Sequence, residues 1–365
     1  MNLRNTTLQS QKQKIDIPLL LITLSLIIFG LLMVYDASAI QGLKDFKDSF
    51  YYIKQQLIWV ALGVVSMAFF IRFNYKNFRS ISVPLLLFSL ILLLAVLIPG
   101  LGVSGGGAHR WLKIAGITVQ PGEIIKLTGV IFLAALFEKK VKFLPYLILV
   151  GGVSFITAVL QKDLGSTIVF VAAAVSLFLA AGGSIWYFLA SIPVGLLGFA
   201  ALVLTSAYRS KRILAFLDPF SDIQGFTYHI SQVLIALGSG GLFGLGLGHS
   251  RQKFEYIPQV STDSIFAIIG EELGFVGGSL LIILFAIILI RGFKIAQNCS
   301  DRFGKILAIG LTSWLGIQVI INLSSMTALL PLTGVPLPFI SYGGSALVAN
   351  LTAVGILLNI SKQNT

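Results

Sequence analysis

The feature that most constrains the fold is a series of ten long apolar segments. They span residues 17–36, 56–71, 81–100, 123–137, 143–160, 164–181, 185–205, 264–290, 305–326 and 344–360. A helix of roughly 20 apolar residues crosses the hydrocarbon core of a bilayer, and most of the segments are close to that length. The sequence therefore predicts an all-α integral membrane protein. We expect a polytopic bundle of about ten transmembrane helices, forming a single domain over residues 1–365.

Composition agrees with a membrane protein. Hydrophobic residues make up 56% of the chain and charged residues only 11%, whereas a soluble protein of this length needs more charge to cover its surface. The single cysteine, Cys299, excludes an internal disulfide framework. Ala37-Ser38-Ala39 imitates a signal-peptidase site. The apolar stretch before it is long and nine more follow, so an uncleaved first helix is predicted.

The basic residues predict how the chain is oriented. If the N-terminus is cytoplasmic, the inner segments hold fourteen of the 26 Lys and Arg residues with three acids, and the outer segments hold twelve with eleven acids. Lys and Arg gather on the cytoplasmic side of membrane proteins. The net charge of +12 thus reflects orientation, and no nucleic-acid partner is expected. Both termini are predicted to be cytoplasmic, with an N-terminal tail at about 1–16 and large extracytoplasmic loops at about 102–122 and 206–263.

The second outer loop contains a glycine-rich stretch. Residues 238–248 read GSGGLFGLGLG, directly after the amphipathic segment YHISQVLIALG. The glycine spacing does not match a dinucleotide-binding fingerprint, and no strand precedes it. The stretch is either a flexible or a tightly packed loop. At membrane depth, irregular backbone is tolerated where it is covered by protein or lines a cavity, which favours a re-entrant or interfacial element.

The first outer loop places basic and aromatic residues together. Arg110 is followed by Trp111, and Glu123 and Lys126 lie one turn apart after Pro121. An arginine beside a tryptophan can hold a phosphate and stack on a sugar, but a tryptophan at this depth is also a common interface anchor. Lys126 can bind an anionic substrate or form a local ion pair with Glu123.

Four separated blocks resemble one known family. The blocks are HRWLKIAGITVQPGEIIKL, QKDLGST, ALGSGGLFGLGLGHSRQKFEYIPQVSTDSIFAIIGEELGF and PLPFISYGGSALVANLTAVGILLNI. In this order they resemble the SEDS proteins of shape, elongation, division and sporulation, the RodA, FtsW and SpoVE family. The residues of the segments LGHSRQKF and VPLPFISYGGS favour the division type. Two departures are Gly122, where the family usually has Ser, and Lys162, where it has Pro.

The resemblance implies a ten-span fold and an activity. Members are peptidoglycan glycosyltransferases that polymerise lipid II on the outer face of the bacterial cytoplasmic membrane. The family's catalytic aspartate falls on Asp263. One carboxylate that acts as a general base suffices for an inverting displacement, with undecaprenyl pyrophosphate as the leaving group. A carboxylate just before a span can alternatively cap the helix.

Further residues are expected to bind substrate or to support the site. Glu271 and Glu272 lie further into the helix and are predicted to be structural, bonded to polar groups of neighbouring spans. Asp163 can pair with Lys126 or Arg110, or position a sugar. The basic residues that flank the glycine-rich stretch suit a pyrophosphate or an anionic lipid head group as a set; they are Arg209, Lys211, Arg212, Arg251 and Lys253. The predicted substrate-binding residues are Arg110, Trp111, Lys126, Asp163, Arg212, Gln232, Lys253, Ser341 and Tyr342.

The sequence also bears on cofactors, partners and competing functions. His109, His229 and His249 have no metal-ligand spacing, so no metal site or cofactor built into the protein is expected, although a divalent cation can accompany the pyrophosphate. The resemblance implies lipid II, a class B penicillin-binding protein, other division or elongation proteins and membrane lipids as partners. Two other functions remain open: a flippase for lipid-linked precursors, and a scaffold of the division machinery without activity.

Overall fold

The computed structural model describes residues 15–105, 108–114, 117–254, 257–258 and 260–363. The predicted tail at 1–16 therefore lies outside the described residues except for its last two positions. The α-helices are α1 (Ile17–Phe46), α2 (Tyr51–Arg72), α3 (Phe78–Ala95), α4 (Pro121–Phe137), α5 (Phe143–Ser154), α6 (Leu164–Ala180), α7 (Ile185–Leu204), α8 (Ala207–Leu217), α9 (Tyr228–Ser239), α10 (Ile265–Asn298), α11 (Arg302–Met326) and α12 (Gly344–Gln363). A 3₁₀ turn, η1 (Tyr75–Asn77), leads into α3, and a π-helix, η2 (Phe155–Leu160), extends α5.

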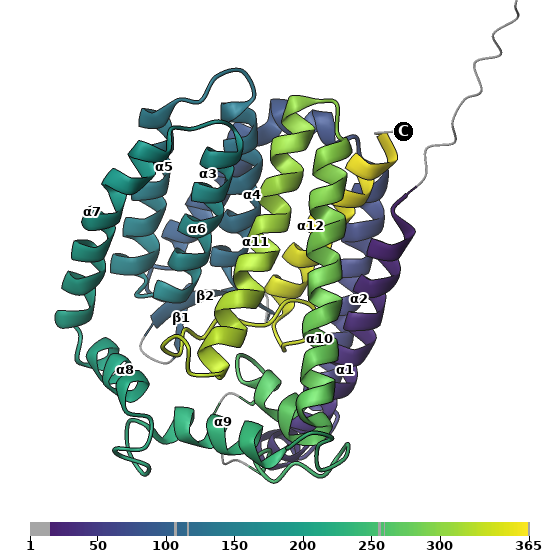
Figure 1. The fold of residues 1–365 in the computed structure, drawn as a ribbon, viewed down its shortest axis with the longest axis vertical. Coiled ribbons are helices and arrows are strands. Elements are labelled where there is room, and N and C mark those ends of the chain that lie inside the picture. The colour runs from purple at the N-terminus through teal and green to yellow at the C-terminus, as the bar shows by residue number, and fades with distance from the viewer. Residues whose placement is uncertain (1–14, 106–107, 115–116, 255–256, 259, 364–365) are drawn as a thin grey trace, which may run out of the picture.

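The helices confirm a polytopic membrane protein. Eight helical segments of the described chain are long and apolar enough to cross a membrane, and they include η1–α3 and α5–η2. The helices α4 and α6 have 17 residues each and run alongside these eight in the bundle (Figure 1). A 17-residue helix is about 26 Å long, close to the thickness of the hydrocarbon core. All ten predicted segments therefore correspond to helices of the bundle.

The two predicted outer loops lie at the same end of the bundle. In Figure 1 the strands β1 and β2 and the helices α8 and α9 lie toward the lower end, whereas the C-terminus and the start of α1 lie at the upper end. This arrangement agrees with the relative sidedness that the basic residues predict.

Burial separates central helices from peripheral ones. Most residues of α11 and α12 are buried, whereas none of the twenty residues of α7 is buried. Apolar side chains are stable at such a surface when the surroundings are lipid. The helix α7 therefore stands at the edge of the bundle (Figure 1).

A small β-sheet in the first outer loop was not predicted. The strands β1 (Gly102–Gly105), β2 (Ala108–Ile114) and β3 (Ile117–Val119) form an antiparallel sheet in the order β1-β2-β3. The all-α fold class holds for the protein as a whole, and the sheet is a local addition within this outer loop. Each strand is short, but β2 pairs on both sides, and its Ala108 and Leu112 are buried. The backbone N–H of His109 donates to the carbonyl of Gln161 (3.1 Å), which ties the sheet to the turn before α6.

The glycine-rich stretch is a packed element. The helix α10 is broken at Gly274, whose φ of 66° lies in the left-handed region. The backbone groups freed there bond to the glycine-rich stretch: Leu245 N–H donates to Glu271 O, and Phe275 N–H donates to Gly241 O, at 3.0 and 2.9 Å. A Cβ on Gly244 would stand 2.1 Å from the carbonyl oxygen of Glu272. The tightly packed alternative is therefore correct, because only glycine allows this approach.

Candidate functional site

Asp263 is held in place by its backbone. It precedes α10 and is 8% exposed. The side-chain amide of Asn322 on α11 donates to the carbonyl of Asp263 (2.9 Å) and to the carbonyl of Val335 (2.8 Å), which fixes two loops to each other. The hydroxyl of Thr262 donates to the Asp263 carboxylate at 3.0 Å. The N-cap of α10 is Ser264, and no side chain caps this helix end. The cap alternative for Asp263 is therefore not what the structure shows.

Asp263 and Arg110 face one small space beside Gly334. Gly334 has a φ of 69°, and a Cβ built on it would stand 3.7 Å from both Arg110 Nη1 and Asp263 Oδ2. A basic group and an acidic group thus approach the same point from the sheet and from the start of α10. The left-handed backbone conformation favours glycine there, and a Cβ would be in ordinary contact with both groups. A reacting group in that space can contact a cation and a base together.

The turn before α6 lies against Arg110 and, together with Arg110 and Asp263, forms one corner of the site. Asp163 is the N-cap of α6, where its carboxylate accepts hydrogen bonds from the Ser166 N–H (3.2 Å) and the Ser166 hydroxyl (2.8 Å). Arg110 Nε lies 3.7 Å from Asp163 Oδ2, which confirms Arg110 as the partner among the alternatives. Arg110 Nε is buried and has no hydrogen-bond partner within the described chain. The guanidinium is thus oriented by a carboxylate while keeping unused donors.

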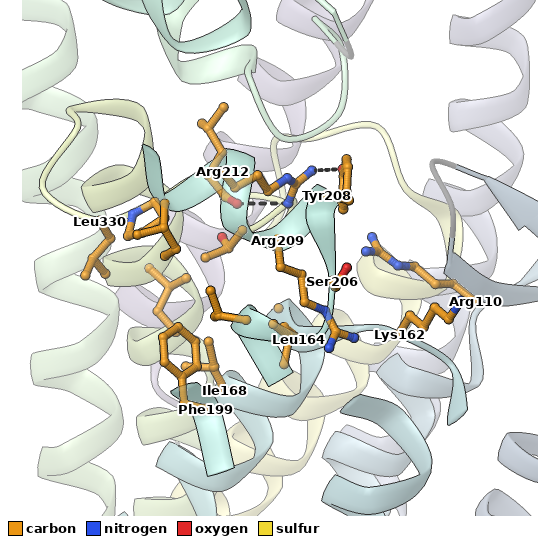
Figure 2. A pocket seen from close by; sticks show the side chains of 17 residues that line it. Arg110, Lys162, Leu164, Ile168, Phe199, Ser206, Tyr208, Arg209, Arg212 and Leu330 are labelled. Atoms are coloured by element: carbon orange, nitrogen blue, oxygen red, sulfur yellow. Dashed lines mark hydrogen bonds between the residues drawn. The ribbon is translucent and has the colours of Figure 1, made fainter. Parts of the chain in front are cut away.

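A cavity of about 530 Å³ extends from this corner toward α7 and α8. Its seventeen lining residues include the four cations Arg110, Lys162, Arg209 and Arg212 and no carboxylate. Most of the remaining lining is apolar and comes from α6, α7, α8 and the segment 330–333. In Figure 2, Arg110 and Lys162 lie at one side of the cavity, and Ile168 and Phe199 lie at another. A cationic side joined to an apolar side suits an amphiphile with an anionic head.

Arg212 connects this cavity with a second one of about 270 Å³. Its guanidinium donates to the carbonyl of Leu332 (2.9 Å) and to the hydroxyl of Tyr208 (Figure 2). It also lies over the Tyr208 ring, 4.7 Å from the centroid. Arg212 is thus fixed at the wall between the two cavities.

His229 lines the second cavity and was not predicted as a site residue. Its Nε2 forms a 2.7 Å hydrogen bond with the hydroxyl of Ser264, the neighbour of Asp263. Burial lowers the pKa of the His229 imidazole below its ordinary value; the charge of Asp263 opposes this shift and that of Arg212 reinforces it. In the sequence, the spacing of the histidines bears only on metal binding. The spacing between His229 and Asp263 carries no local pattern that would have linked them.

Lys126 lies inside the bundle. It is 1% exposed, and its ammonium binds Glu123 Oε1 at 2.7 Å and Gln318 Oε1 at 3.1 Å. The ion pair that the sequence offered as an alternative is therefore present. Lys126 is not among the residues that line either cavity, so a direct role in substrate binding stays a prediction that this conformation does not favour.

Lys253 and the two glutamates of α10 form a second buried network. Lys253 Nζ contacts Asp36 Oδ1 on α1 (2.7 Å) and Glu272 Oε1 (3.2 Å). Glu271 accepts from the Ser250 hydroxyl and from the backbone N–H of Arg251. The two glutamates are structural as predicted, but their partners lie mainly in the segment 250–253, not on neighbouring spans. The reason is that the break in α10 draws this segment against the helix.

The other predicted substrate residues lie around the site without lining either cavity. The Ser341 hydroxyl accepts from the Leu337 N–H (2.8 Å), and the Tyr342 N–H donates to the carbonyl of Ser261 (2.8 Å). The Ser341 bond closes the turn at 337–341, and the Tyr342 bond ties that turn to the segment that carries Asp263. Gln232 on α9 is half-buried. Trp111 follows Arg110 in β2, and successive strand residues point to opposite faces of a sheet.

Metal ligands do not gather in the part of the chain that the structure describes. No group of three or more His, Cys, Asp or Glu residues there is arranged to hold an ion.

Known proteins match nearly the whole chain. The sequence profile described as "Cell cycle protein", that of the FtsW, RodA and SpoVE family, matches residues 17–365. Stage V sporulation protein E of Bacillus subtilis is 42% identical over 97% of this chain and 99% of its own. A protein of Geobacter metallireducens described as probable peptidoglycan glycosyltransferase FtsW is 39% identical over 100% of this chain and 99% of its own.

Solved structures share the fold. A chain in a structure of a peptidoglycan synthase complex that coordinates polymerization and crosslinking matches with a TM-score of 0.76, at 26% identity, covering 96% of this chain and 98% of that one. The rod shape determining protein RodA of Thermus thermophilus matches with a TM-score of 0.69, at 25% identity, covering 96% and 97%. The chain therefore belongs to the FtsW/RodA/SpoVE family of multi-pass membrane proteins.

Proposed function

We propose that this protein is a peptidoglycan glycosyltransferase that polymerises lipid II on the outer face of the bacterial cytoplasmic membrane. The observation that carries the proposal is the approach of Asp263 and Arg110 to one point beside Gly334. Relatives of similar length that are described as peptidoglycan glycosyltransferases support it.

The reaction assigns a role to each side of this corner. The Asp263 carboxylate takes the proton from the 4-hydroxyl of the acceptor sugar as the oxygen attacks C1 of the donor sugar. The bond from C1 to the pyrophosphate breaks, and undecaprenyl pyrophosphate leaves. Because the donor linkage is α and the glycan linkage is β, one displacement with inversion is required, and one carboxylate suffices. Arg110 neutralises the charge that develops on the leaving group.

The cavity favours this function over lipid transport. Its four cations come from the sheet, the turn before α6 and the helix α8, which all lie toward the end of the bundle that carries the outer loops (Figure 1). A precursor flippase needs a polar path that reaches both membrane faces. The apolar α6 and α7 residues suit the polyprenyl chain of a substrate held at one face.

The proposed function includes a protein partner that crosslinks the product. One structural neighbour comes from a peptidoglycan synthase complex, which supports a class B penicillin-binding protein that crosslinks the glycan. Other division or elongation proteins and membrane lipids are further proposed partners. We propose no cofactor built into the protein, and both termini in the cytoplasm.

The test is polymerisation of labelled lipid II by the purified full-length chain, with and without a class B penicillin-binding protein. Asp263→Asn retains an acceptor for the Thr262 hydroxyl but cannot take a proton. Loss of a general base costs about 10²–10⁴-fold in rate, so Asp263→Asn should insert, purify and bind lipid II while forming almost no glycan. Asp218→Asn, an exposed change in the same outer loop, is the control. Near-normal glycan synthesis by Asp263→Asn would exclude Asp263 as the base.

A further inference from the structure

Lys162 occupies an unusual backbone position at the mouth of the large cavity. Its φ is 59°, in the left-handed region that glycine and asparagine adopt more readily than lysine. The flanking residues enforce this turn, because Gln161 N–H donates to Ile156 O (2.9 Å) and Asp163 N–H donates to Thr157 O (2.8 Å). Proline, which stands here in the family motif, has its φ fixed near −65° and cannot adopt this conformation. At this position the protein therefore carries the ammonium group of a lysine in place of the proline ring.

The Lys162 ammonium has unused hydrogen-bonding capacity. Arg209 donates to the carbonyls of Leu202 (3.1 Å) and Ala158 (2.8 Å), and Arg212 is bound to Leu332 and Tyr208. Within the described chain, Lys162 is exposed and forms neither a hydrogen bond nor an ion pair. Its three donors are therefore available to a ligand, as is the unpartnered Nε of Arg110 on the same side of the cavity (Figure 2).

We propose that Lys162 binds the pyrophosphate of the lipid-linked donor, beside Arg110, and stabilises it as it leaves. The inference rests on the proposed glycosyltransferase function. When the C1–O bond breaks, a pyrophosphate that was esterified at both ends becomes free at one end and gains a negative charge. A cation placed where charge develops lowers the barrier more than it strengthens ground-state binding. Lys162 is thus a specificity-determining residue for a pyrophosphate leaving group.

The decisive variants are Lys162→Asn and Lys162→Arg in the full-length protein. Asparagine tolerates positive φ and removes the charge, whereas arginine keeps the charge. Lys47→Asn is a matched control, because Lys47 is also an exposed lysine with a φ of 56°, at the end of α1. We expect Lys162→Asn to lower the rate of lipid II polymerisation about tenfold or more, mainly in kcat. Lys162→Arg should stay within about threefold of wild type, and Lys47→Asn should match wild type.

A binding measurement separates this inference from the proposed function. Undecaprenyl pyrophosphate should raise the Tm of wild type and of Asp263→Asn, and the rise should be smaller in Lys162→Asn. Inorganic pyrophosphate and phosphatidylglycerol should produce little effect at the same concentration, since each lacks half of the ligand. An equal Tm rise in Lys162→Asn, or an equal response to phosphatidylglycerol, overturns the inference even if the wild type polymerises lipid II. A lysine-dependent Tm rise in a protein that makes no glycan keeps the binding site and rejects the enzyme. If Lys162→Asn does not purify, Lys162→Gly serves in its place.

Discussion

At the scale of single residues, buried charges divide into those that are already paired and those that face open space. Glu123 is bound by Lys126, and Glu272 is bound by Lys253. Asp263 instead approaches the space beside Gly334. A buried carboxylate that is not taken up by a direct ion pair is a candidate for function. The sequence alone could not make this division, because Gln318, a partner of Lys126, lies 192 residues away along the chain.

His229 predicts a pH dependence of stability. Burial lowers its pKa in the folded protein below the ordinary value of 6.5. As the pH falls through 6.5, the unfolded chain binds a proton that folded His229 does not yet accept, so the stability that is present above this pH is progressively lost. His229→Gln should therefore lose less Tm than wild type between about pH 7 and pH 5.

The control for this prediction is His249→Gln, an exposed histidine of the same outer loop. Its Tm should follow that of the wild type across the same pH range, as measured by thermal unfolding in detergent. A wild-type decline that His229→Gln does not reduce would assign the acid sensitivity to other groups.

At the scale of elements, α10 shows what a hydropathy pattern conveys and what it omits. The pattern predicted a span at 264–290, and the helix begins one residue later, at Ile265, and ends eight residues later, at Asn298. It did not predict the break at Gly274. The break is stable because the glycine-rich stretch supplies hydrogen-bond partners to the freed backbone groups. Such long-range backbone pairing leaves no periodic trace in the sequence.

Two glycines of this stretch allow a matched test of that packing. Gly244 and Gly248 have φ angles of 80° and 81°, but a Cβ would meet the backbone of Glu272 at 2.1 Å on Gly244 and nothing within 4 Å on Gly248. Alanine at either position should lower the free energy of unfolding by about 1–2 kcal/mol, because its Cβ disfavours the left-handed conformation. Gly244→Ala should add about 1–3 kcal/mol from overpacking and so have the lower Tm. Equal Tm values for the two variants would show that the stretch does not pack tightly against α10.

At the scale of the whole molecule, topology was more predictable than the outer surface. The ten spans follow from segment length and hydropathy, since each must satisfy its backbone within lipid. The sheet β1-β2-β3 and the helix α8 lie outside the ten spans, in the two predicted outer loops, so that constraint does not predict them. The Asp263 position followed from family resemblance. The cavity depends on α6, α7 and α8 meeting the segment 330–333, a contact that sequence spacing does not encode.

Orientation of the whole molecule decides whether Asp263 faces the outer compartment. Native Cys299 is 6% exposed, so its protection from reagents would be uninformative, and the test needs exposed cysteines in a Cys299→Ala background. Ser221→Cys lies in the loop between α8 and α9, and Lys140→Cys lies between α4 and α5; both positions are exposed. Because Lys and Arg concentrate at the end of the bundle that includes Lys140, an impermeant maleimide should label Ser221→Cys in intact cells and Lys140→Cys only after permeabilisation. The reverse pattern would place Asp263 at the cytoplasmic face, where a polymerase of exported lipid II has no substrate.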